Sequence, residues 1–395
     1  MLARFERWGR TSRVGSRPLI WIHAPSVGEG LQARPILEAL RGRNPGLQLA
    51  YTYYSPSAKA FAADLDVDFC EVLPFDTRRA AKGTLDALQP SALIFSKLDV
   101  WPELVEAAGR RRIPTALMSA TLSIDSSRTG KLAAFLLRDA YAQLDAVGAI
   151  STEDADRLIE LGCRAGVVQV TGDTRFDQVI ARARRTDPSS PLLSRLRCDR
   201  PTLVAGSTWP ADEQELLGAL NSAAVRDARL RTIIAPHEPT SAHVAPIERW
   251  AAAAGLSHAT LGSAAAPVAD VVIVDRVGIL GELYALADVA FVGGGFHAAG
   301  LHSVVEPAAF GVPVLFGPRH HGSRDAGLLL EAGGARTADD RTKLAGALRD
   351  WLEHPAIRRA AGAAAQRVVE ANAGATERSV ALIESLIAAS PRRER

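Results

Sequence analysis

The sequence predicts an α/β protein with two doubly wound parallel sheets, each covered by helices on both faces. Short β-branched and apolar runs alternate with amphipathic segments over residues 19–171, and the same alternation starts again at Thr202. A chain of 395 residues exceeds what one hydrophobic core usually holds, so two domains are expected. Their expected bounds are 1–185 for an N-terminal domain, 186–201 for a linker, 202–375 for a C-terminal domain and 376–395 for a last helix able to pack back on the first domain.

The first half opens on a buried strand, LIWIHA, followed by the turn PSVGEG and a helix that carries Leu31, Ile36, Leu37 and Leu40. The later segments repeat this strand, turn and helix order. Strands are expected at residues 19–24, 47–53, 72–75, 92–96, 115–119, 146–150 and 167–171, and further helices at 55–63, 79–88, 101–111 and 152–161.

The alternation stops at residues 180–201, which are rich in Arg, Pro and Ser and are expected to form the linker. A second series then follows, and the segment 337–388 is predicted to be largely helical. Expected strands lie at 202–205, 232–235, 271–274, 287–292 and 312–317, and expected helices at 212–222 and 241–254. Ligands of doubly wound sheets lie beyond the carboxyl ends of the strands, so the turns there are the candidate sites.

Composition excludes several classes of protein. The net charge of +2 and the lack of a basic run interleaved with aromatics argue against nucleic-acid binding. Cys70, Cys163 and Cys198 lack metal-ligand spacing and fit a reducing, cytosolic compartment. No apolar run approaches the ~20 residues that span a bilayer, and no signal-peptide core is present.

The first residues have the pattern of a short interfacial helix. Leu2, Phe5 and Trp8 share one arc of a helical wheel, and the arginines at positions 4, 7, 10 and 13 lie mostly outside it. This arc is the candidate contact with a membrane surface. The alternative is a frayed basic terminus, because isolated helices this short are marginal in water.

The stretch FVGGGFHAAGLHSVVEPAAFGVPVLFGP reads as strand, glycine turn, helix and strand. Glycines let a backbone pass close to a ligand, and a helix starting near residues 301–303 would aim N–H groups at a phosphate. Glu306, about one turn inside, would take two ribose hydroxyls. Alternatively, the glycines only permit close helix packing and Glu306 only complements the helix dipole.

Glu29 is the candidate general base of the first half. It lies on a glycine-flanked turn between a buried strand and a helix, where a carboxylate can deprotonate a hydroxyl or can simply cap the helix. Lys97 and Asp99 follow the strand at 92–96 and flank the same edge, unless they form a solvated pair.

Two turns of the second half can contact a phosphate. Ser207 and Thr208 lie between a strand and a helix, where they can also be ordinary N-caps. His237 follows the next strand and can donate to a phosphate or sugar, although a lone histidine is more often structural. The spacing of the histidines at 297, 302, 320 and 321 fits no familiar zinc set, so no metal is expected.

Motifs along residues 20–318 together resemble the Kdo transferase family, where Kdo is 3-deoxy-D-manno-octulosonic acid, and within it a sub-branch with lysine at position 97. The resemblance implies a two-domain GT-B fold that transfers Kdo from CMP-Kdo to a lipid A precursor, with inversion and without a metal or other cofactor. The motifs are IWIHAPSVGEG, YYSPSA, LPFDT, SKLDVWPEL, IPTALMSA, VTGDTRFDQV, AGSTWPADEQELL, IIAPHEP, LGELYALADVAFVGGGF and LHSVVEPAAFGVPVLFGP.

The residue patterns and the resemblance together assign the site. Glu29 matches the family's catalytic glutamate and Glu306 its donor-site glutamate. The chain departs from the family in three places: many members have two acidic residues before Trp-Pro, an asparagine is common at position 303, and most have a longer apolar N-terminus. The full assignment is Glu29 as base, Ser26, Gly28, Gly30, Lys97 and Asp99 as acceptor contacts, and Ser207, Thr208, His237, Gly294, Gly295, His302, Ser303 and Glu306 as nucleotide contacts.

The resulting expectation is a peripheral enzyme of lipopolysaccharide inner-core synthesis at the cytoplasmic face of the inner membrane. Its expected partners are CMP-Kdo, a lipid A precursor and the membrane surface. Two alternatives remain: a GT-B enzyme that acts on a UDP-sugar, as glycosyltransferase or 2-epimerase, and a non-catalytic relative that binds CMP or lipid.

Overall fold

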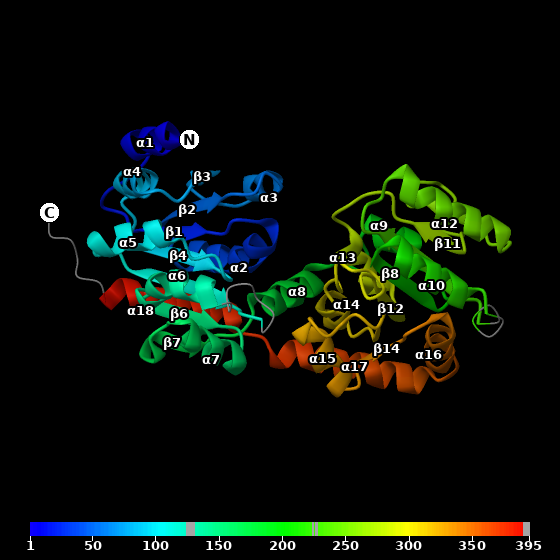
Figure 1. The fold of residues 1–395 in the computed structure, drawn as a ribbon. Coiled ribbons are helices and arrows are strands. Elements are labelled where there is room, and N and C mark those ends of the chain that lie inside the picture. The colour runs from blue at the N-terminus through cyan, green and yellow to red at the C-terminus, as the bar shows by residue number, and fades with distance from the viewer. Residues whose placement is uncertain (124–130, 223–224, 226–227, 390–395) are drawn as a thin grey trace. The chain divides into compact units, whose positions relative to one another are not determined.

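The computed structural model describes residues 1–123, 131–222, 225 and 228–389. The chain divides into two compact units, residues 1–178 with 372–395 and residues 179–371. Each unit contains one parallel sheet of seven strands with helices packed on it (Figure 1). This confirms the α/β, doubly wound class. The last six residues of the predicted C-terminal helix, 390–395, lie outside the described part of the chain.

The sheet of the first unit has the strand order β3-β2-β1-β4-β5-β6-β7. Its strands are β1 (Leu19–His23), β2 (Gln48–Tyr53), β3 (Phe69–Val72), β4 (Ala92–Ser96), β5 (Thr115–Ala120), β6 (Ala146–Ala149) and β7 (Val168–Val170). Its helices are α1 (Leu2–Thr11), α2 (Val27–Arg43), α3 (Ala58–Ala63), α4 (Arg78–Leu88), α5 (Pro102–Arg110), α6 (Lys131–Ala142), α7 (Thr152–Leu161), the short 3-10 turn η2 (Ala165–Val167) and α18 (Ala375–Ala389).

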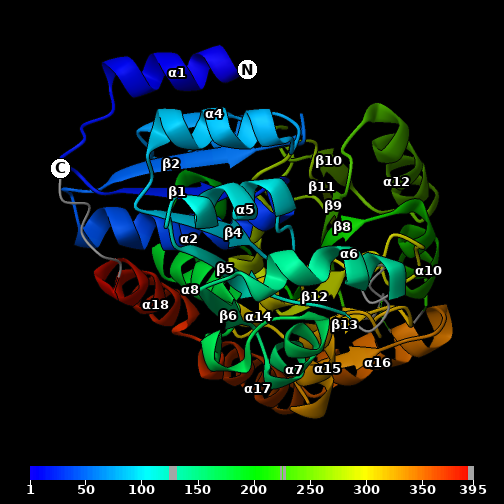
Figure 2. The same ribbon diagram turned by 60° about the vertical axis from the view of Figure 1, so that its left-hand side comes forward.

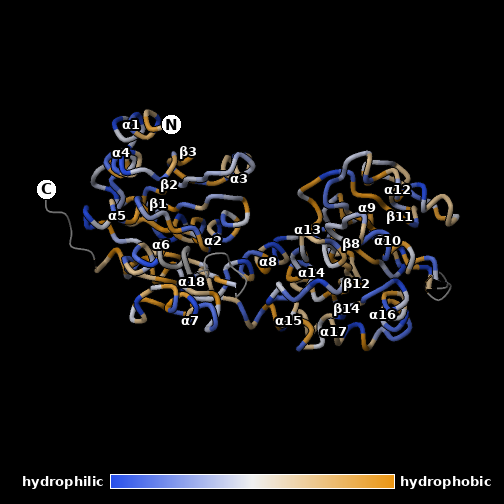
Figure 3. The backbone as a smooth tube through the Cα atoms, in the orientation of Figure 1, coloured by the Kyte–Doolittle hydropathy of each residue, from blue (hydrophilic) through white to orange (hydrophobic). Residues whose placement is uncertain are grey.

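The strand β1 shows how both faces of this sheet are buried. Leu19 and Trp21 pack toward α1, α4 and α5, whereas Ile20 and Ile22 pack toward α2 and α18. Because successive side chains of a strand point to opposite faces, a strand covered on both sides must be apolar throughout, as LIWIH is. Figure 3 shows the same apolar strands inside each unit.

The last helix, α18, belongs to the first unit. Val380 and Ile383 are buried against α2 and the strands beside it. At the start of this helix, the Asp177 carboxylate accepts the N–H groups of Gly374 and Thr376, both at 2.6 Å.

The apolar arc of α1 is covered by the protein itself, and α1 lies along α4 in both views (Figures 1 and 2). Phe5 is fully buried, and the Trp8 indole N–H donates to the carbonyl of Asp68 at 3.1 Å. Leu2 packs so closely on Gly83 that a Cβ there would lie 2.8 Å from it. The hypothesis that this arc enters a membrane is therefore wrong, because it packs on α4 and the sheet.

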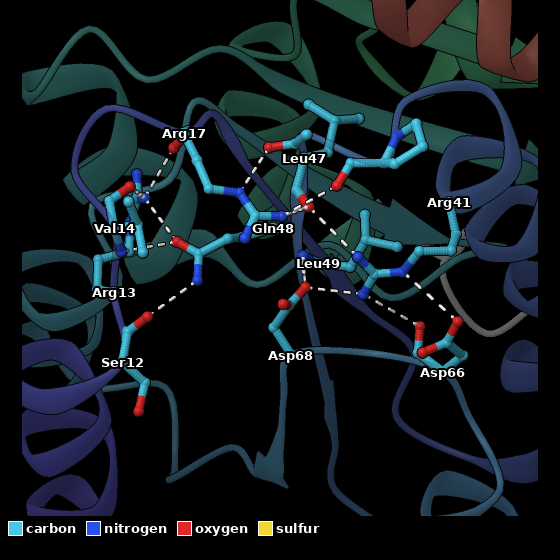
Figure 4. A network of polar contacts seen from close by, with 12 residues as sticks. Ser12, Arg13, Val14, Arg17, Arg41, Leu47, Gln48, Leu49, Asp66 and Asp68 are labelled. Carbon is cyan, nitrogen blue, oxygen red and sulfur yellow. Dashed lines mark hydrogen bonds and ion pairs between the residues drawn. The ribbon is translucent and has the colours of Figure 1, made fainter.

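Two of the arginines at this end are held by protein groups as well. Arg4 forms an ion pair with Glu71 at 2.8 Å. The Arg13 guanidinium donates to the carbonyl of Leu88 and to the Gln48 side chain, both at 2.9 Å, and Figure 4 shows the Gln48 contact within a network that continues along β2. The chain before β1 is thus fastened to the sheet, whereas Arg7 and Arg10 are exposed.

The sheet of the second unit has the order β10-β11-β9-β8-β12-β13-β14. Its strands are β8 (Thr202–Thr208), β9 (Arg231–Pro236), β10 (His258–Thr260), β11 (Val271–Ile273), β12 (Val289–Val292), β13 (Val314–Phe316) and β14 (Ala335–Thr337). Its helices are α9 (Pro191–Leu196), α10 (Pro210–Leu220), α12 (Ser241–Ala253), α13 (Leu280–Leu283), the 3-10 turn η3 (Tyr284–Leu286), α14 (Val305–Ala309), α15 (Arg324–Glu331), α16 (Arg341–Glu353) and α17 (Pro355–Ala371).

The boundary between the units differs from the predicted one. The division falls inside α8 (Thr174–Arg185) and again after α17. The segment predicted as a linker contains α9, whose Leu193 and Leu196 are buried in the core of the second unit. Its Arg, Pro and Ser content reflects the exposed face of this short helix and its flanking turns.

Candidate active site

Both sheets have a point where the strand order reverses, and the predicted site residues gather there. In the first unit the reversal lies between β1 and β4, and in the second between β8 and β12. Crevices at such points, beyond the carboxyl ends of the strands, are the usual ligand sites of doubly wound sheets.

In the first unit, Glu29 connects the turns after β1 and β4. Its Oε2 accepts the backbone N–H of Ser26 at 3.1 Å and also the Ser26 hydroxyl. Its Oε1 lies 3.7 Å from the Lys97 ammonium, an ion-pair distance that is too long for a hydrogen bond. The Ser96 hydroxyl fixes the turn by donating to the Glu29 carbonyl at 2.9 Å. One carboxylate oxygen is thus anchored, and the other faces a cation.

The backbone beside Glu29 is strained. Lys97 has φ 66° and Ser119, on the next strand, has φ 50°, in the left-handed region that side chains other than glycine rarely adopt. Such strain clusters at functional sites. Asp99, two residues beyond Lys97, is half-buried.

The two glycines of the first turn have different surroundings. A Cβ on Gly28 would meet only the Ser26 hydroxyl, at 3.7 Å, so space is open above it. A Cβ on Gly30 would lie 2.5 Å from Phe61 and 2.8 Å from the Tyr51 hydroxyl. Gly30 is therefore a packing residue, buried below the turn, and its assignment to the acceptor site is corrected.

Aromatic side chains extend along the same edge. Tyr54, after β2, makes edge contacts with Phe75, which follows β3, and with Trp101, at centroid distances of 5.6 and 5.7 Å. Phe75 is 69% exposed and Tyr54 is 40% exposed. The turns after β2 and β3 thus present apolar rings to solvent beside the turn that carries Glu29.

In the second unit, Asp212 holds the glycine turn. Its fully buried carboxylate accepts the N–H groups of Gly294 at 2.7 Å, Phe296 at 2.9 Å and Trp209 at 2.9 Å. These amides are already paired, so the Gly294 N–H is not available to a phosphate. The expected cradle is corrected on this point.

The three consecutive glycines allow backbone to pack on backbone. A Cβ on Gly293 would lie 2.2 Å from the carbonyl oxygen of Ser207, and one on Gly295 would lie 2.4 Å from the amide of Gly317. Gly294, with φ 94°, leaves no room beside the carbonyl of Gly300. The glycines thus have a packing role, but they pack against backbone at the end of β8, after β13 and in their own loop, and not against a helix as the alternative had it.

The helix expected from residues 301–303 begins later. It is α14, whose five residues start at Val305, so His302 and Ser303 lie in the preceding loop and Glu306 lies in the first turn. Glu306 approaches Arg182 of α8 at 3.5 Å. Burial raises the pKa of the Glu306 carboxyl, and Arg182 opposes this. Val304, with helical φ and ψ, precedes the helix and has no side-chain oxygen to cap it.

Ser207 and Thr208 have separate roles. The buried Thr208 hydroxyl donates to Glu213 at 2.8 Å, which makes it structural. Ser207 has φ 54° and is half-buried, and its hydroxyl has no hydrogen-bond partner among the described residues. Of the two, Ser207 is the one left to meet a ligand.

A cluster of four rings, which we call the ring stack, lies over these turns and consists of Trp209, His237, His297 and His302. The Trp209 indole N–H donates to Nε2 of His302 at 3.0 Å. His237 stacks on Trp209 at 4.4 Å and on His302 at 4.6 Å, and His297 stacks on Trp209 at 4.4 Å. In the described part of the chain, no group of three or more His, Cys, Asp or Glu residues is arranged to hold a metal ion.

Sequence reasoning did not assign Trp209, Asp212, Arg182 or His297 to the site. Asp212 had a local signal, because an acidic residue three positions after an N-cap often accepts its N–H. The stack had none, because its rings come from three strand ends that are distant in the sequence.

Two doubly wound units with polar residues at their switch points define the GT-B class. Solved structures of this fold match nearly the whole chain. A putative UDP-N-acetylglucosamine 2-epimerase from Listeria monocytogenes covers 96% of this chain and 99% of its own, with TM-score 0.67 and 15% identity. A UDP-GlcNAc 2-epimerase from Neisseria meningitidis covers 94% and 99%, with TM-score 0.66 and 11% identity. At these identities the likeness concerns the fold alone.

The family follows from sequence. Residues 3–178 match the family model of the 3-deoxy-D-manno-octulosonic-acid transferase (kdotransferase). The 3-deoxy-D-manno-octulosonic acid transferase of Bordetella pertussis is 32% identical over 97% of this chain and 90% of its own length, and that of Haemophilus influenzae is 27% identical over 96% and 90%. The chain belongs to this family and is a glycosyltransferase, as the motifs predicted.

Proposed function

We propose that the protein transfers Kdo from CMP-Kdo to a hydroxyl of a lipid A precursor, with inversion and with Glu29 as general base. The observation that carries this proposal is the position of Glu29 at the switch point of the first sheet. Its Oε2 is fixed by Ser26, and its Oε1 faces Lys97 at 3.7 Å. A base must be both oriented and free to take a proton, and the two oxygens divide these tasks.

The donor is assigned to the second unit. Glu306, half-buried in the first turn of α14, is the proposed acceptor of hydrogen bonds from two ribose hydroxyls. Ser207, His237, His302 and Ser303 are the proposed contacts of the nucleotide. The acceptor is assigned to Ser26, Gly28, Lys97 and Asp99 in the first unit. No metal is part of the proposal, because N–H donors can meet the charge on the leaving phosphate.

The test is an incubation with CMP-Kdo and a tetraacylated lipid A precursor, read by mass spectrometry. The expected result is an increase in acceptor mass by one or more Kdo residues. The UDP-sugar alternative predicts thermal stabilisation by UDP and not by CMP. A binding-only relative predicts CMP binding with no mass change, and either result overturns the proposal.

The membrane contact is proposed anew at the exposed aromatic edge of the first unit. In the described residues, no helix is long and apolar enough to cross a membrane. Phe75 and Tyr54 are exposed rings of this unit, and Lys59 of α3 and Arg78 and Lys82 of α4 are exposed cations of the same unit. Aromatic rings suit the headgroup boundary, and basic residues are attracted to anionic lipids. This edge is the proposed contact with the cytoplasmic face of the inner membrane.

Phe75→Ala should weaken binding to anionic vesicles about 5-fold or more, as expected from about 1 kcal/mol for partial burial of a phenyl ring. The control is Val268→Ala, which removes a side chain that is 79% exposed in the second unit. Sedimentation at low and high salt measures both. Equal sedimentation of the two variants would remove Phe75 from the contact.

A further inference from the structure

The ring stack has a geometry that goes beyond holding a nucleotide. The planes of Trp209 and His302 differ by 13°, and the two rings meet edge to edge through the indole N–H. His237 lies over both rings. His297 is nearly parallel to Trp209, at 9°. Parallel imidazoles hold their nitrogens in separate planes, so the stack does not converge on a metal ion.

The hydrogen bond fixes the protonation of His302. An indole N–H can only donate, so Nε2 of His302 must present a lone pair. The ring is therefore neutral and carries its proton on Nδ1. Burial lowers the pKa of His302, His237 and His297 lower it further, and Asp212 acts in the opposite direction. Without a ligand, the stack thus contains an imidazole that does not hold a second proton.

The stack lies where an anion is expected. Its rings follow β9, β8 and β12, which are neighbours in the sheet, so they share one carboxyl edge. The nearest acidic groups from α10 are occupied, because Asp212 accepts three backbone N–H groups and Glu213 accepts the Thr208 hydroxyl. Burial raises the pKa of Glu213, and the hydrogen bond from Thr208 and, less strongly, His243 of α12 oppose this.

The titratable side chains of the loop after β13 are one arginine and two histidines. The Arg319 amide is bonded to the carbonyl of Gly295, and its side chain is exposed. His320 and His321 follow, and burial lowers the pKa of His320. The loop from residue 317 to residue 323 therefore carries no acidic side chain.

We propose that the ring stack binds the phosphate of CMP or CMP-Kdo and takes up one proton when it does so. Trp209 is the positioning residue, because its N–H keeps His302 neutral before the ligand binds. This rests on the proposed function. A bound phosphate favours the imidazolium, which neutral His302 becomes by taking a proton on Nε2 and releasing the indole N–H.

The same proton completes the transfer. The acceptor oxygen bonds to the anomeric carbon of Kdo while the bond from that carbon to the phosphate oxygen breaks, and its electron pair stays on the phosphate. The acceptor proton passes to Glu29. The imidazolium N–H protonates the departing phosphate oxygen, so CMP leaves as a monoanion and the stack returns to its neutral state. The protonated His302 ring thus supplies the positive charge that stabilises the leaving phosphate.

Calorimetry of CMP binding at pH 7.5, in two buffers of different ionisation enthalpy, measures the proton directly. At this pH the phosphate of CMP is already a dianion, since its second pKa is about 6. The expected uptake is about one proton with CMP and none with cytidine; inorganic phosphate is already partly protonated at this pH, so it should take up less than one proton. Between pH 8.5 and 7 the dissociation constant of CMP should fall by up to about tenfold per pH unit.

The control variant His354→Gln removes a histidine outside the stack, directly after α16, and should keep the uptake. The proposal is overturned if cytidine causes the same proton uptake as CMP. It is also overturned if CMP binds without proton uptake. If Kdo is transferred but no proton is taken up, only this inference fails. If CMP does not bind at all, the proposed donor fails with it.

Trp209→Phe keeps a stacking ring and removes the indole N–H. In the ligand-free wild type, nitrogen NMR of the imidazoles should show His302 with its proton on Nδ1, and in the variant on Nε2 or on both nitrogens. Because the lost bond favoured the neutral ring, the pKa of His302 should rise and the proton uptake at pH 7.5 should shrink. A wild-type His302 protonated on Nε2 contradicts the role of Trp209, whether or not CMP binds.

Discussion

The two units place a carboxylate at the same position and use it differently. Glu29 is the third residue of α2 and Asp212 the third residue of α10, and each accepts the N–H of the residue before its helix, at 3.1 and 2.9 Å. The second oxygen of Asp212 is taken by the Phe296 N–H, whereas that of Glu29 faces Lys97. The Asp212 side chain is fully buried, and that of Glu29 is 14% exposed.

The neighbouring strand decides the difference. After β12, glycines expose backbone N–H groups that a short aspartate can reach and saturate. After β4 the chain presents the Lys97 side chain, so the longer glutamate keeps an oxygen free of backbone partners. A carboxylate at this position is structural by default, and it becomes chemically available where the adjacent turn leaves it unsaturated.

The largest expected effect is a difference in the free energy of unfolding between variants of Asp212 and Glu29. Asp212→Ala leaves three N–H groups without their acceptor, at about 1 kcal/mol or more each, so the free energy of unfolding should fall by about 3 kcal/mol or more. Glu29→Gln keeps an acceptor for Ser26 and should cost much less. Chemical denaturation measures both. Equal losses would mean that Glu29 is as structural as Asp212.

The rate of Kdo transfer should depend strongly on Glu29, although the stability depends on it only weakly. Glu29→Gln should keep the fold and CMP affinity while lowering the rate of Kdo transfer about 100-fold or more, because general-base catalysis typically contributes that much. The rate is measured at saturating CMP-Kdo, with CMP affinity from calorimetry as the control. Activity within a few-fold of the wild type would leave Glu29 as a helix cap.

Acid should act on the first unit through His23, at the end of β1. Burial lowers the pKa of His23 to about 3, and a bond to the Thr52 carbonyl opposes this slightly. The unfolded chain binds this proton below about pH 6.5, so the His23 contribution to stability is constant above that pH and falls toward pH 3, by about 2 to 3 kcal/mol at pH 4.5.

His23→Asn removes this titration and keeps a donor for Thr52, so the dependence of unfolding free energy on pH should flatten by that amount. The control is His258→Asn, at an exposed histidine in the second unit. An unchanged acid slope would mean that His23 is protonated in the folded protein.

The smallest effect concerns the donor. Glu306→Ala should weaken CMP binding by about 1 to 3 kcal/mol, the cost of leaving hydroxyl partners unpaired. Calorimetry on folded protein measures it, and Arg182→Gln tests whether the loss comes from the ion pair at 3.5 Å. If CMP binds the alanine variant as tightly as the wild type, Glu306 is outside the nucleotide site.

The fold could be read from local patterns because most strands are short apolar runs ended by turns. The strand β4 and helix α7 have the expected bounds. The strand β3 was expected at residues 72–75 and lies at Phe69–Val72, because Pro74 has no N–H for the ladder and the run CEV was too polar to suggest a strand. The burial pattern of this edge strand, with Phe69 alone fully covered, explains that polarity.

Long-range partners set the limit of such prediction. An amphipathic arc such as Leu2, Phe5 and Trp8 does not reveal whether protein or lipid covers it, and here α4 does. The glycine turn likewise does not reveal that Asp212, far back in the sequence, accepts its amides. Positions of candidate residues at strand ends were predictable, but which of their groups are already paired was not.

The place of α18 has a consequence for how the chain is made. The second unit is one continuous segment, whereas the first unit needs both residues 1–178 and the much later α18. During synthesis, the early segment emerges with the face around Ile22 and Met118 uncovered until Val380 and Ile383 arrive. The second unit can therefore finish folding before the first unit does. Until then, the uncovered apolar face of the first unit is available to chaperones and to incorrect association with other chains.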